Sequence, residues 1–150
     1  MNYEVVYLEP KNVIGFTART NNTSPEMSTV IGGCWQKLYN PINFTKVKNR
    51  ANEKALGVYT EYENKELGNY TIMTGFEVTN SDRVEGFDTI TIPAGKYAKF
   101  IVKGNMITAV QEFWQRLWQM NLNRAYRYDF EEYQNADSEN AEIHIYISIQ

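Results

Sequence analysis

The chain has 150 residues, enough for one domain, and carries a formal net charge of −3 at pH 7. It has no block of Lys and Arg for phosphate contacts, so we expect no direct binding to nucleic acid. With no apolar stretch long enough to span a membrane and no signal-peptide pattern at its start, it is expected to be soluble and cytoplasmic.

The first half predicts a strand region, a helix and a hairpin. Residues 3–20 form an extended apolar stretch broken near Pro10. A helix is then expected, with Ser24 as N-cap and Pro25 in the first turn, ending at Pro41. Its apolar face carries residues three and four positions apart: Met27, Val30, Ile31, Cys34, Trp35 and Leu38. Cys34 is therefore expected in the core.

Residues 43–54 are polar and predicted to be irregular. Two runs rich in Val, Ile, Thr and aromatic residues follow, ALGVYTEYE (55–63) and YTIMTGFEV (70–78). The six residues between them, NKELGN, form a turn-like cluster. Together the three segments predict a β-hairpin.

The second half repeats this order. FDTITIPAGKYAKFIVKG (87–104) is extended with a turn at its PAG motif, and residues 106–122 form the strongest predicted helix, capped by Asn105. We expect its apolar face to consist of Ile107, Val110, Trp114, Leu117, Trp118 and Leu122. YDFEEYQN (128–135) and AEIHIYISI (141–149) then predict two strands, the second with strict alternation.

This order predicts an α+β fold made of duplicated βαββ units related by a pseudo-twofold axis. Repeat one would span about residues 1–80 and repeat two about residues 85–150, within a single domain. Antiparallel sheets would carry two helices that flank a central groove. Seams between repeated units are common ligand sites, so this groove is the expected binding site.

The second half also resembles a known family, the GyrI-like effector-binding domains, which occur at the C-termini of AraC- and MerR-type transcription regulators. The resemblance rests on an ordered set of motifs: TIPAGKYAKFIVKG (91–104), FWQRLW (113–118), DFEEY (129–133) and EIHIYISI (142–149). It implies a groove that takes small, often cationic and hydrophobic molecules. No helix-turn-helix segment precedes the matching region, so DNA binding is not carried over.

The two adjacent glutamates of DFEEY are expected to differ in their surroundings. In an extended segment Asp129, Glu131 and Tyr133 share one face, while Glu132 points to the other. The resemblance implies that Glu131 is the carboxylate of an aromatic pocket, with Tyr133 on the same side. We expect Glu132 to lie at the surface.

Aromatic residues make up 14% of the chain, and several could surround Glu131. A desolvated cation held by a carboxylate gains about 0.5–2 kcal/mol from each aromatic ring that it contacts. The candidate ligand-binding residues are Glu131, Tyr133, Trp114, Trp118, Tyr97, Tyr59 and Tyr146. For Trp114 and Trp118 the alternative is a place in the core, and for Tyr146 an exposed position.

No metal site and no cofactor are expected. One histidine, without a cysteine pair, cannot build a zinc site, and His144 is expected to be an exposed strand residue. No glycine-rich phosphate loop is present.

The leading interpretation is a stand-alone effector-binding protein that captures a small amphipathic, cationic molecule in transcription regulation or in drug and stress sensing. Two alternatives stay open. One is a small-molecule hydrolase in which Glu131, with Tyr133, acts as general base. The other is a protein-interaction module that binds a protein partner, as a topoisomerase modulator would.

Overall fold

The computed structural model describes residues 1–80 and 82–150 and contains eight strands and three helices in that part of the chain. The first half contains β1 (Glu4–Leu8), β2 (Lys11–Thr20), α1 (Met27–Tyr39), α2 (Pro41–Lys46), β3 (Arg50–Thr60) and β4 (Tyr70–Val78). The second contains β5 (Asp88–Ile92), β6 (Gly95–Gly104), α3 (Met106–Trp118), β7 (Tyr128–Tyr133) and β8 (Ala141–Ser148).

All eight strands join one antiparallel sheet in the order β1-β6-β8-β7-β3-β4-β2-β5. The unit β2-α1-β3-β4 is repeated as β6-α3-β7-β8. From the outside of the sheet toward its centre, the strands of the first unit follow the order β2-β4-β3, and those of the second follow the equivalent order β6-β8-β7. The pseudo-twofold axis therefore passes between β3 and β7, which pair at the centre of the sheet. The predicted α+β fold of duplicated βαββ units is confirmed.

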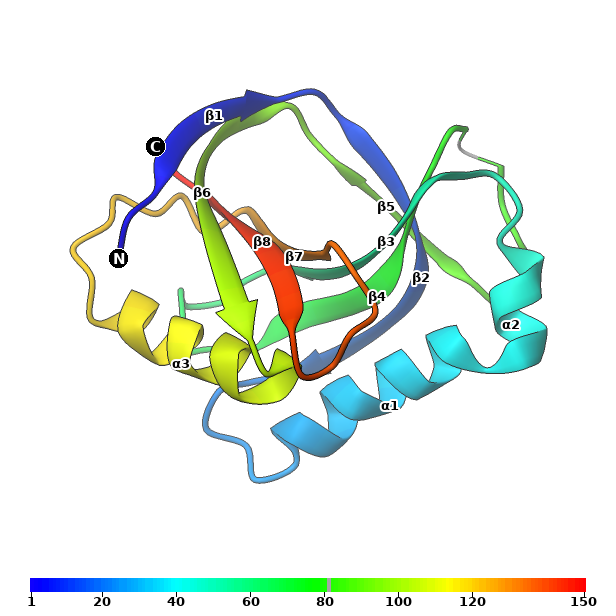
Figure 1. Ribbon diagram of the computed structural model, residues 1–150, viewed down its shortest axis with the longest axis horizontal. Helices are drawn as coiled ribbons and strands as arrows, with labels where there is room; N and C mark the ends of the chain where they lie inside the picture. Colours follow the sequence, from blue (N-terminus) through cyan, green and yellow to red (C-terminus); the bar gives the residue numbers. More distant parts are fainter. Residues whose placement is uncertain (81) are drawn as a thin grey trace.

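The sheet curls into a half-barrel (Figure 1). Its concave face holds one core cluster, made of Val13, Leu56, Val58, Met73, Ile92, Tyr97, Phe130 and Tyr146. Gly15 and Gly75 face each other between β2 and β4. A Cβ built on Gly15 would lie 1.8 Å from the carbonyl oxygen of Thr74, so this close backbone approach requires a residue without a side chain.

The helices lie outside the curl, on the convex face (Figure 1). α1 packs on β2 and β4, whereas α3 packs on β6 and β8. The helices therefore cover the outer strands of each unit, and the central pair β3 and β7 lies between the parts of the sheet that they cover. None of the described helices is long and apolar enough to cross a membrane.

Several local expectations need correction. α1 begins at Met27 rather than Pro25, and the hydroxyl of Ser24 accepts a hydrogen bond from the Glu26 amide in the preceding turn. The segment 43–54 is not irregular, because it contains most of α2 and the start of β3.

For α3, the predicted N-terminal cap is confirmed, whereas the predicted apolar face is only partly right. The side chain of Asn105 accepts hydrogen bonds from the amides of Ile107 and Thr108, so the predicted cap is confirmed. Phe113 and Leu117 are buried under α3, but Ile107 is 67% exposed and Trp118 is 44% exposed. The core-facing side of α3 is therefore centred further toward Phe113 than the sequence pattern indicated.

Candidate functional site

The central strand pair carries one carboxylate on the face that points toward the helices. Glu131 on β7 lies directly opposite Gly57 on β3, and it shares its face of the sheet with Ile145 on β8. Ile145 belongs to the cluster beneath α3, so Glu131 also points toward the helices. The residue is only 2% exposed, which makes it a buried acid, as expected.

Three aromatic side chains donate hydrogen bonds to this carboxylate. The hydroxyl of Tyr133 donates to Oε1 at 2.9 Å, and that of Tyr59 donates to Oε2 at 3.0 Å. The indole nitrogen Nε1 of Trp114 also donates to Oε2, at 2.8 Å. Three of the predicted residues are thus brought together around Glu131.

Burial is the largest cause of the pKa shifts of Glu131, Tyr59 and Tyr133. Desolvation raises the pKa of Glu131, and the hydrogen bonds from Trp114, Tyr133 and Tyr59 offset only part of this shift. Burial, followed by the nearby charge of Glu131, raises the pKa of both Tyr59 and Tyr133 well above the ordinary value of 10.0. The two hydroxyls therefore stay protonated and can act as donors at neutral pH.

The rings around Glu131 follow the pseudo-twofold symmetry. Trp35 and Trp114 are each the ninth residue of a 13-residue helix, counted from Met27 and Met106. Tyr59 follows Gly57 by two positions, as Tyr133 follows Glu131. Trp114 packs edge-on against Tyr59 with ring centroids 5.1 Å apart, and Trp35 packs edge-on against Tyr133 at 5.3 Å. We call these four rings the aromatic cage.

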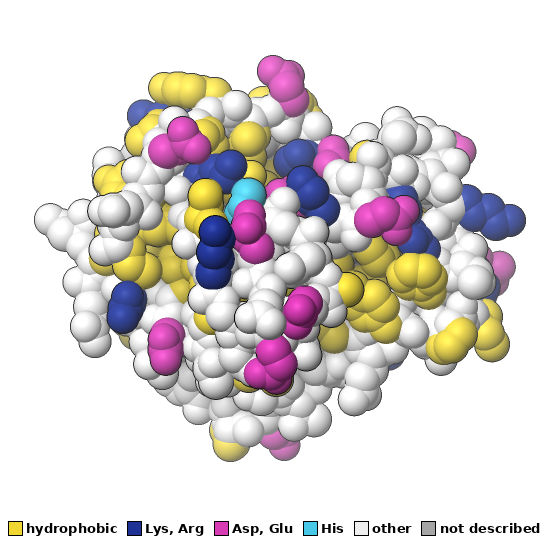
Figure 2. Space-filling view, in the orientation of Figure 1, with side chains coloured by type: hydrophobic (Ala, Val, Ile, Leu, Met, Phe, Trp, Pro, Cys, Tyr) yellow, Lys and Arg dark blue, Asp and Glu magenta, His cyan; other side chains and the backbone are white. Residues whose placement is uncertain are grey.

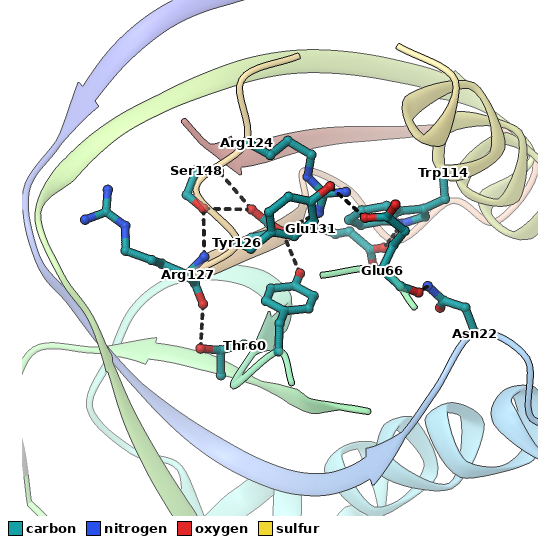
Figure 3. A network of polar contacts seen from close by, with 11 residues as sticks. Asn22, Thr60, Glu66, Trp114, Arg124, Tyr126, Arg127, Glu131 and Ser148 are labelled. Carbon is teal, nitrogen blue, oxygen red and sulfur yellow. Dashed lines mark hydrogen bonds and ion pairs between the residues drawn. The ribbon is translucent and has the colours of Figure 1, made fainter. Parts of the chain in front are cut away.

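A second buried carboxylate lies on the same face, two residues earlier on β7. Asp129 is fully buried, and its Oδ2 pairs with Arg124 Nη2 at 2.8 Å. Tyr62 donates to the same oxygen, while Oδ1 accepts from the amide and hydroxyl of Ser148. Figure 3 shows Arg124 and Ser148 gathered on one side of Glu131, with Trp114 on the other.

The Arg124 side chain extends this network to the loop between β3 and β4. Its guanidinium carbon lies 4.2 Å from the ring centre of Tyr126, whose hydroxyl donates to Glu66 Oε2 at 2.7 Å. Burial alone would lower the pKa of Arg124, but the charge of Asp129, its hydrogen bond and the nearby tyrosines together outweigh burial and raise that pKa. Asp129 thus has a permanent counter-ion within the protein.

The sequence of this chain matches the model of a known protein family. From residue 4 to residue 149 the sequence matches Cass2, described as integron-associated effector binding protein. The chain belongs to the Cass2 family. Since Cass2 is a GyrI-like family, the resemblance seen in the sequence is confirmed. A search of the curated proteins found no match.

Solved structures with the Cass2-family fold cover almost the whole chain. An integron cassette protein of Vibrio cholerae, VCH_CASS2, has 26% identity and a TM-score of 0.78 over 99% of this chain and 95% of that one. SAV2435, solved bound to tetraphenylphosphonium, has 22% identity and a TM-score of 0.79 over 100% and 94%. The EcmrR C-terminal domain has 16% identity and a TM-score of 0.58 over 100% and 99%.

Not all predicted site residues of this Cass2-family protein lie near Glu131. Tyr97 and Tyr146 belong to the core of the concave face, on the other side of the sheet. Tyr146 stacks on Phe130 with ring centroids 4.7 Å apart, and the hydroxyl of Tyr97 donates to the carbonyl of Pro93. Trp118 lies at the end of α3, and among the described residues it makes no hydrogen bond to Glu131.

Two polar residues that were expected at the surface are less exposed than predicted: Glu132 is buried and His144 is half-buried. Glu132 is 8% exposed, and its Oε1 accepts a hydrogen bond from Gln134 at 2.8 Å. The side chain of His144, opposite Glu132 on β8, is 15% exposed and pairs with Glu142 at 2.8 Å. The expectation for Glu132 was wrong and that for His144 was only partly right, because the curl of the sheet shields its inner face. Figure 2 shows the histidine among acidic and basic side chains that are mixed on the visible surface.

Trp35 is the cage residue that sequence reasoning missed. It was assigned only to the apolar face of the first helix. Its signal was the repeat, because Trp35 and Trp114 occupy the same position in equivalent helices. Cys34, next to it, is 5% exposed and lies in the core as predicted.

Proposed function

We propose that this protein captures a small amphipathic cation in the groove between α1 and α3, with Glu131 as its counter-ion. One contrast carries the proposal. Asp129 is neutralised by Arg124 at 2.8 Å, whereas among the described residues no Lys, Arg or His forms an ion pair with Glu131. Its three side-chain partners are neutral donors.

The energetics favour a positive charge supplied from outside. A buried carboxylate without a cation is costly, and the raised pKa of Glu131 expresses that cost. A bound cation would remove it while also facing the rings of the cage. Each ring contributes about 0.5–2 kcal/mol of cation–π attraction, with the larger values where water is excluded.

The known relatives support this ligand class and a sensing role. SAV2435 has the same fold and was solved with tetraphenylphosphonium, a lipophilic cation. The Cass2 family is described as effector binding. We therefore propose drug or stress sensing, coupled to transcription regulation, as the biological role of cation capture.

Ligand entry requires movement of the cage. Glu131 is 2% exposed, and the side chains of Tyr59, Tyr133 and Trp114 all contact it. A cavity of about 780 Å³ lies elsewhere, on the concave side, with Thr17, Arg19 and Tyr128 in its lining. A cation that reaches Glu131 therefore has to part the aromatic rings and take the place of their mutual contacts.

Titration with tetraphenylphosphonium, followed by quenching of tryptophan fluorescence, tests the proposal. Wild type should bind, and Glu131→Gln should weaken binding by roughly tenfold or more, since the charge pairing with the cation is lost. Glu132→Gln is the matched control, because this neighbouring carboxylate points to the other face. It should change the Kd less than about twofold. Unchanged binding in Glu131→Gln would refute Glu131 as the counter-ion.

A hydrolase is the second candidate, favoured by the raised pKa of Glu131. A carboxylate of increased basicity beside a tyrosine hydroxyl can serve as general base. Hydrolysis of an activated ester that disappears in Glu131→Gln, with binding of the uncleaved ester analogue retained, would support this role. A panel of esters left intact by the wild type would count against it.

A further inference from the structure

The geometry points to a specific class of ligand: a monocation whose charge lies between two apolar arms, one for each repeat of the chain. This inference rests on the proposed function and goes beyond it, because charge alone does not distinguish a centre-charged molecule from an end-charged one. The symmetry of the aromatic cage around Glu131 makes that distinction.

The carboxylate sits at the pseudo-twofold axis rather than to one side of it. Glu131 faces Gly57 across the central strand pair. Each carboxylate oxygen receives one tyrosine hydroxyl, Oε1 from Tyr133 and Oε2 from Tyr59. A positive charge held by both oxygens would therefore have one tyrosine on each side.

An apolar ring extends the site beyond each tyrosine. Trp114 packs against Tyr59 at 5.1 Å on one side, and Trp35 packs against Tyr133 at 5.3 Å on the other. One pair thus combines α3 with β3, and the other combines α1 with β7. The two Trp–Tyr pairs form two apolar surfaces at similar positions on either side of a single charge.

Trp35 is the one residue of the aromatic cage that forms no hydrogen bond with the Glu131 carboxylate in the described part of the chain. Trp114 satisfies Glu131 with its indole N–H, whereas no hydrogen bond joins Trp35 to Glu131 in the described part of the chain. Its ring instead lies over Gly57, where Cζ2 would be 3.3 Å from an added Cβ. We assign it to contact with the second arm of the ligand.

An end-charged amphiphile would occupy only one of the two pairs. A centre-charged cation with two aryl arms would occupy both, and aromatic contacts of this kind strengthen binding by roughly tenfold for each arm. The second arm should therefore bind through Trp35.

Two phosphonium ions that share the same charged atom provide the probes. Dimethyldiphenylphosphonium has two aryl arms, and trimethylphenylphosphonium has one. Calorimetric titration of wild type should show that the second phenyl group strengthens binding by roughly tenfold. In Trp35→Leu this gain should fall to less than about threefold. Trp118→Leu, at an exposed position of α3, should keep the full gain.

The outcomes separate this inference from the function on which it rests. A full gain retained in Trp35→Leu, or no gain in wild type, would overturn the two-armed ligand while leaving cation capture intact. Failure of both ions to bind wild type would instead defeat cation capture. If thermal melting shows that Trp35→Leu is unfolded, Trp35→Phe replaces it. The smaller ring should then reduce the gain at least twofold, and a full gain would overturn the inference.

Discussion

Gly57 and Glu131 face each other at the centre of the sheet, and a Cβ on Gly57 would lie 3.0 Å from Glu131 Oε1. The same Cβ would lie 3.3 Å from Trp35 Cζ2. A missing side chain on one repeat therefore provides the space in which the carboxylate of the other repeat and one ring of the cage meet.

Gly57→Ala should weaken cation binding by roughly tenfold, because three hydrogen bonds hold Glu131 in place and resist the required shift. Calorimetric titration with tetraphenylphosphonium measures the effect. Gly32→Ala is the control, since a Cβ there meets nothing within 4 Å. That helix substitution should leave binding unchanged and raise the free energy of unfolding by about 0.5–1 kcal/mol. Equal affinities for Gly57→Ala and wild type would contradict the close packing described.

Cation affinity should depend on pH through Glu131. Burial raises its pKa above the ordinary value of 4.5, and only the ionised carboxylate attracts a cation. Affinity should be full above the raised pKa and fall up to about tenfold for each pH unit below it. Titrations with tetraphenylphosphonium between pH 4 and pH 8 would show this, because the charge of that ion does not change with pH. A flat profile that matches Glu131→Gln would argue against an ionised counter-ion.

The stability of the ligand-free protein should respond in the opposite direction. Because the folded-state pKa of Glu131 is raised, the folded protein binds this proton more tightly than the unfolded chain does. The resulting stabilisation is fully present below the ordinary value of 4.5 and is lost as the pH rises through the folded-state pKa. Urea unfolding of wild type and Glu131→Gln across this window should show the loss in wild type alone. A parallel decline in both proteins would assign it to other groups.

Removal of Arg124 should be strongly destabilising. Arg124→Met leaves the fully buried Asp129 without its counter-ion, and breaking such a pair costs about 3–5 kcal/mol in the free energy of unfolding. Lys103→Met is the comparison, because its ion pair with Glu142 is exposed and should contribute less than about 1 kcal/mol. Urea denaturation of both variants checks the difference. Similar small losses would mean that Asp129 is satisfied without Arg124.

Substitution of Asn105, at the start of α3, should reduce stability more than substitution of Ser24, before the start of α1. Asn105→Ala removes a side chain that accepts two amide hydrogen bonds, so it should cost about 1 kcal/mol of stability. Ser24→Ala should cost less than half of that, because Ser24 precedes the start of α1 and accepts from one amide in an exposed turn. Thermal unfolding of the two variants measures both effects. A larger loss in Ser24→Ala would show that the turn before α1 is part of its cap.

Local patterns in the sequence were sufficient for the duplicated fold and for part of the site. Alternation within β7 separates Glu131 from Glu132, and the family motif indicates which of them is surrounded by aromatic side chains. The cap at Asn105 follows from its side-chain chemistry alone. These features depend on neighbours a few positions away, which a single sequence displays directly.

The wrong placements of Tyr97, Tyr146 and Glu132 share one physical origin, the curl of the sheet. Alternation places Tyr146 opposite the isoleucines of its own strand, but it does not show which face meets the helices or that both faces are enclosed. Tyr97 was therefore placed in the groove and Glu132 at the surface, whereas both are buried on the concave side. Trp35 needed a long-range argument, since only the equivalence of the two helices brings it to Tyr133.

Duplication of a unit ordinarily produces two copies of each functional group. At the axis of this protein a second glutamate in place of Gly57 would stand against the first, and two carboxylates at such a distance share one proton instead of carrying two charges. The difference between the equivalent positions Gly57 and Glu131 therefore sets the ratio at one cation per chain. The two repeats place one carboxylate in the aromatic cage between them, which matches the site to a single cation.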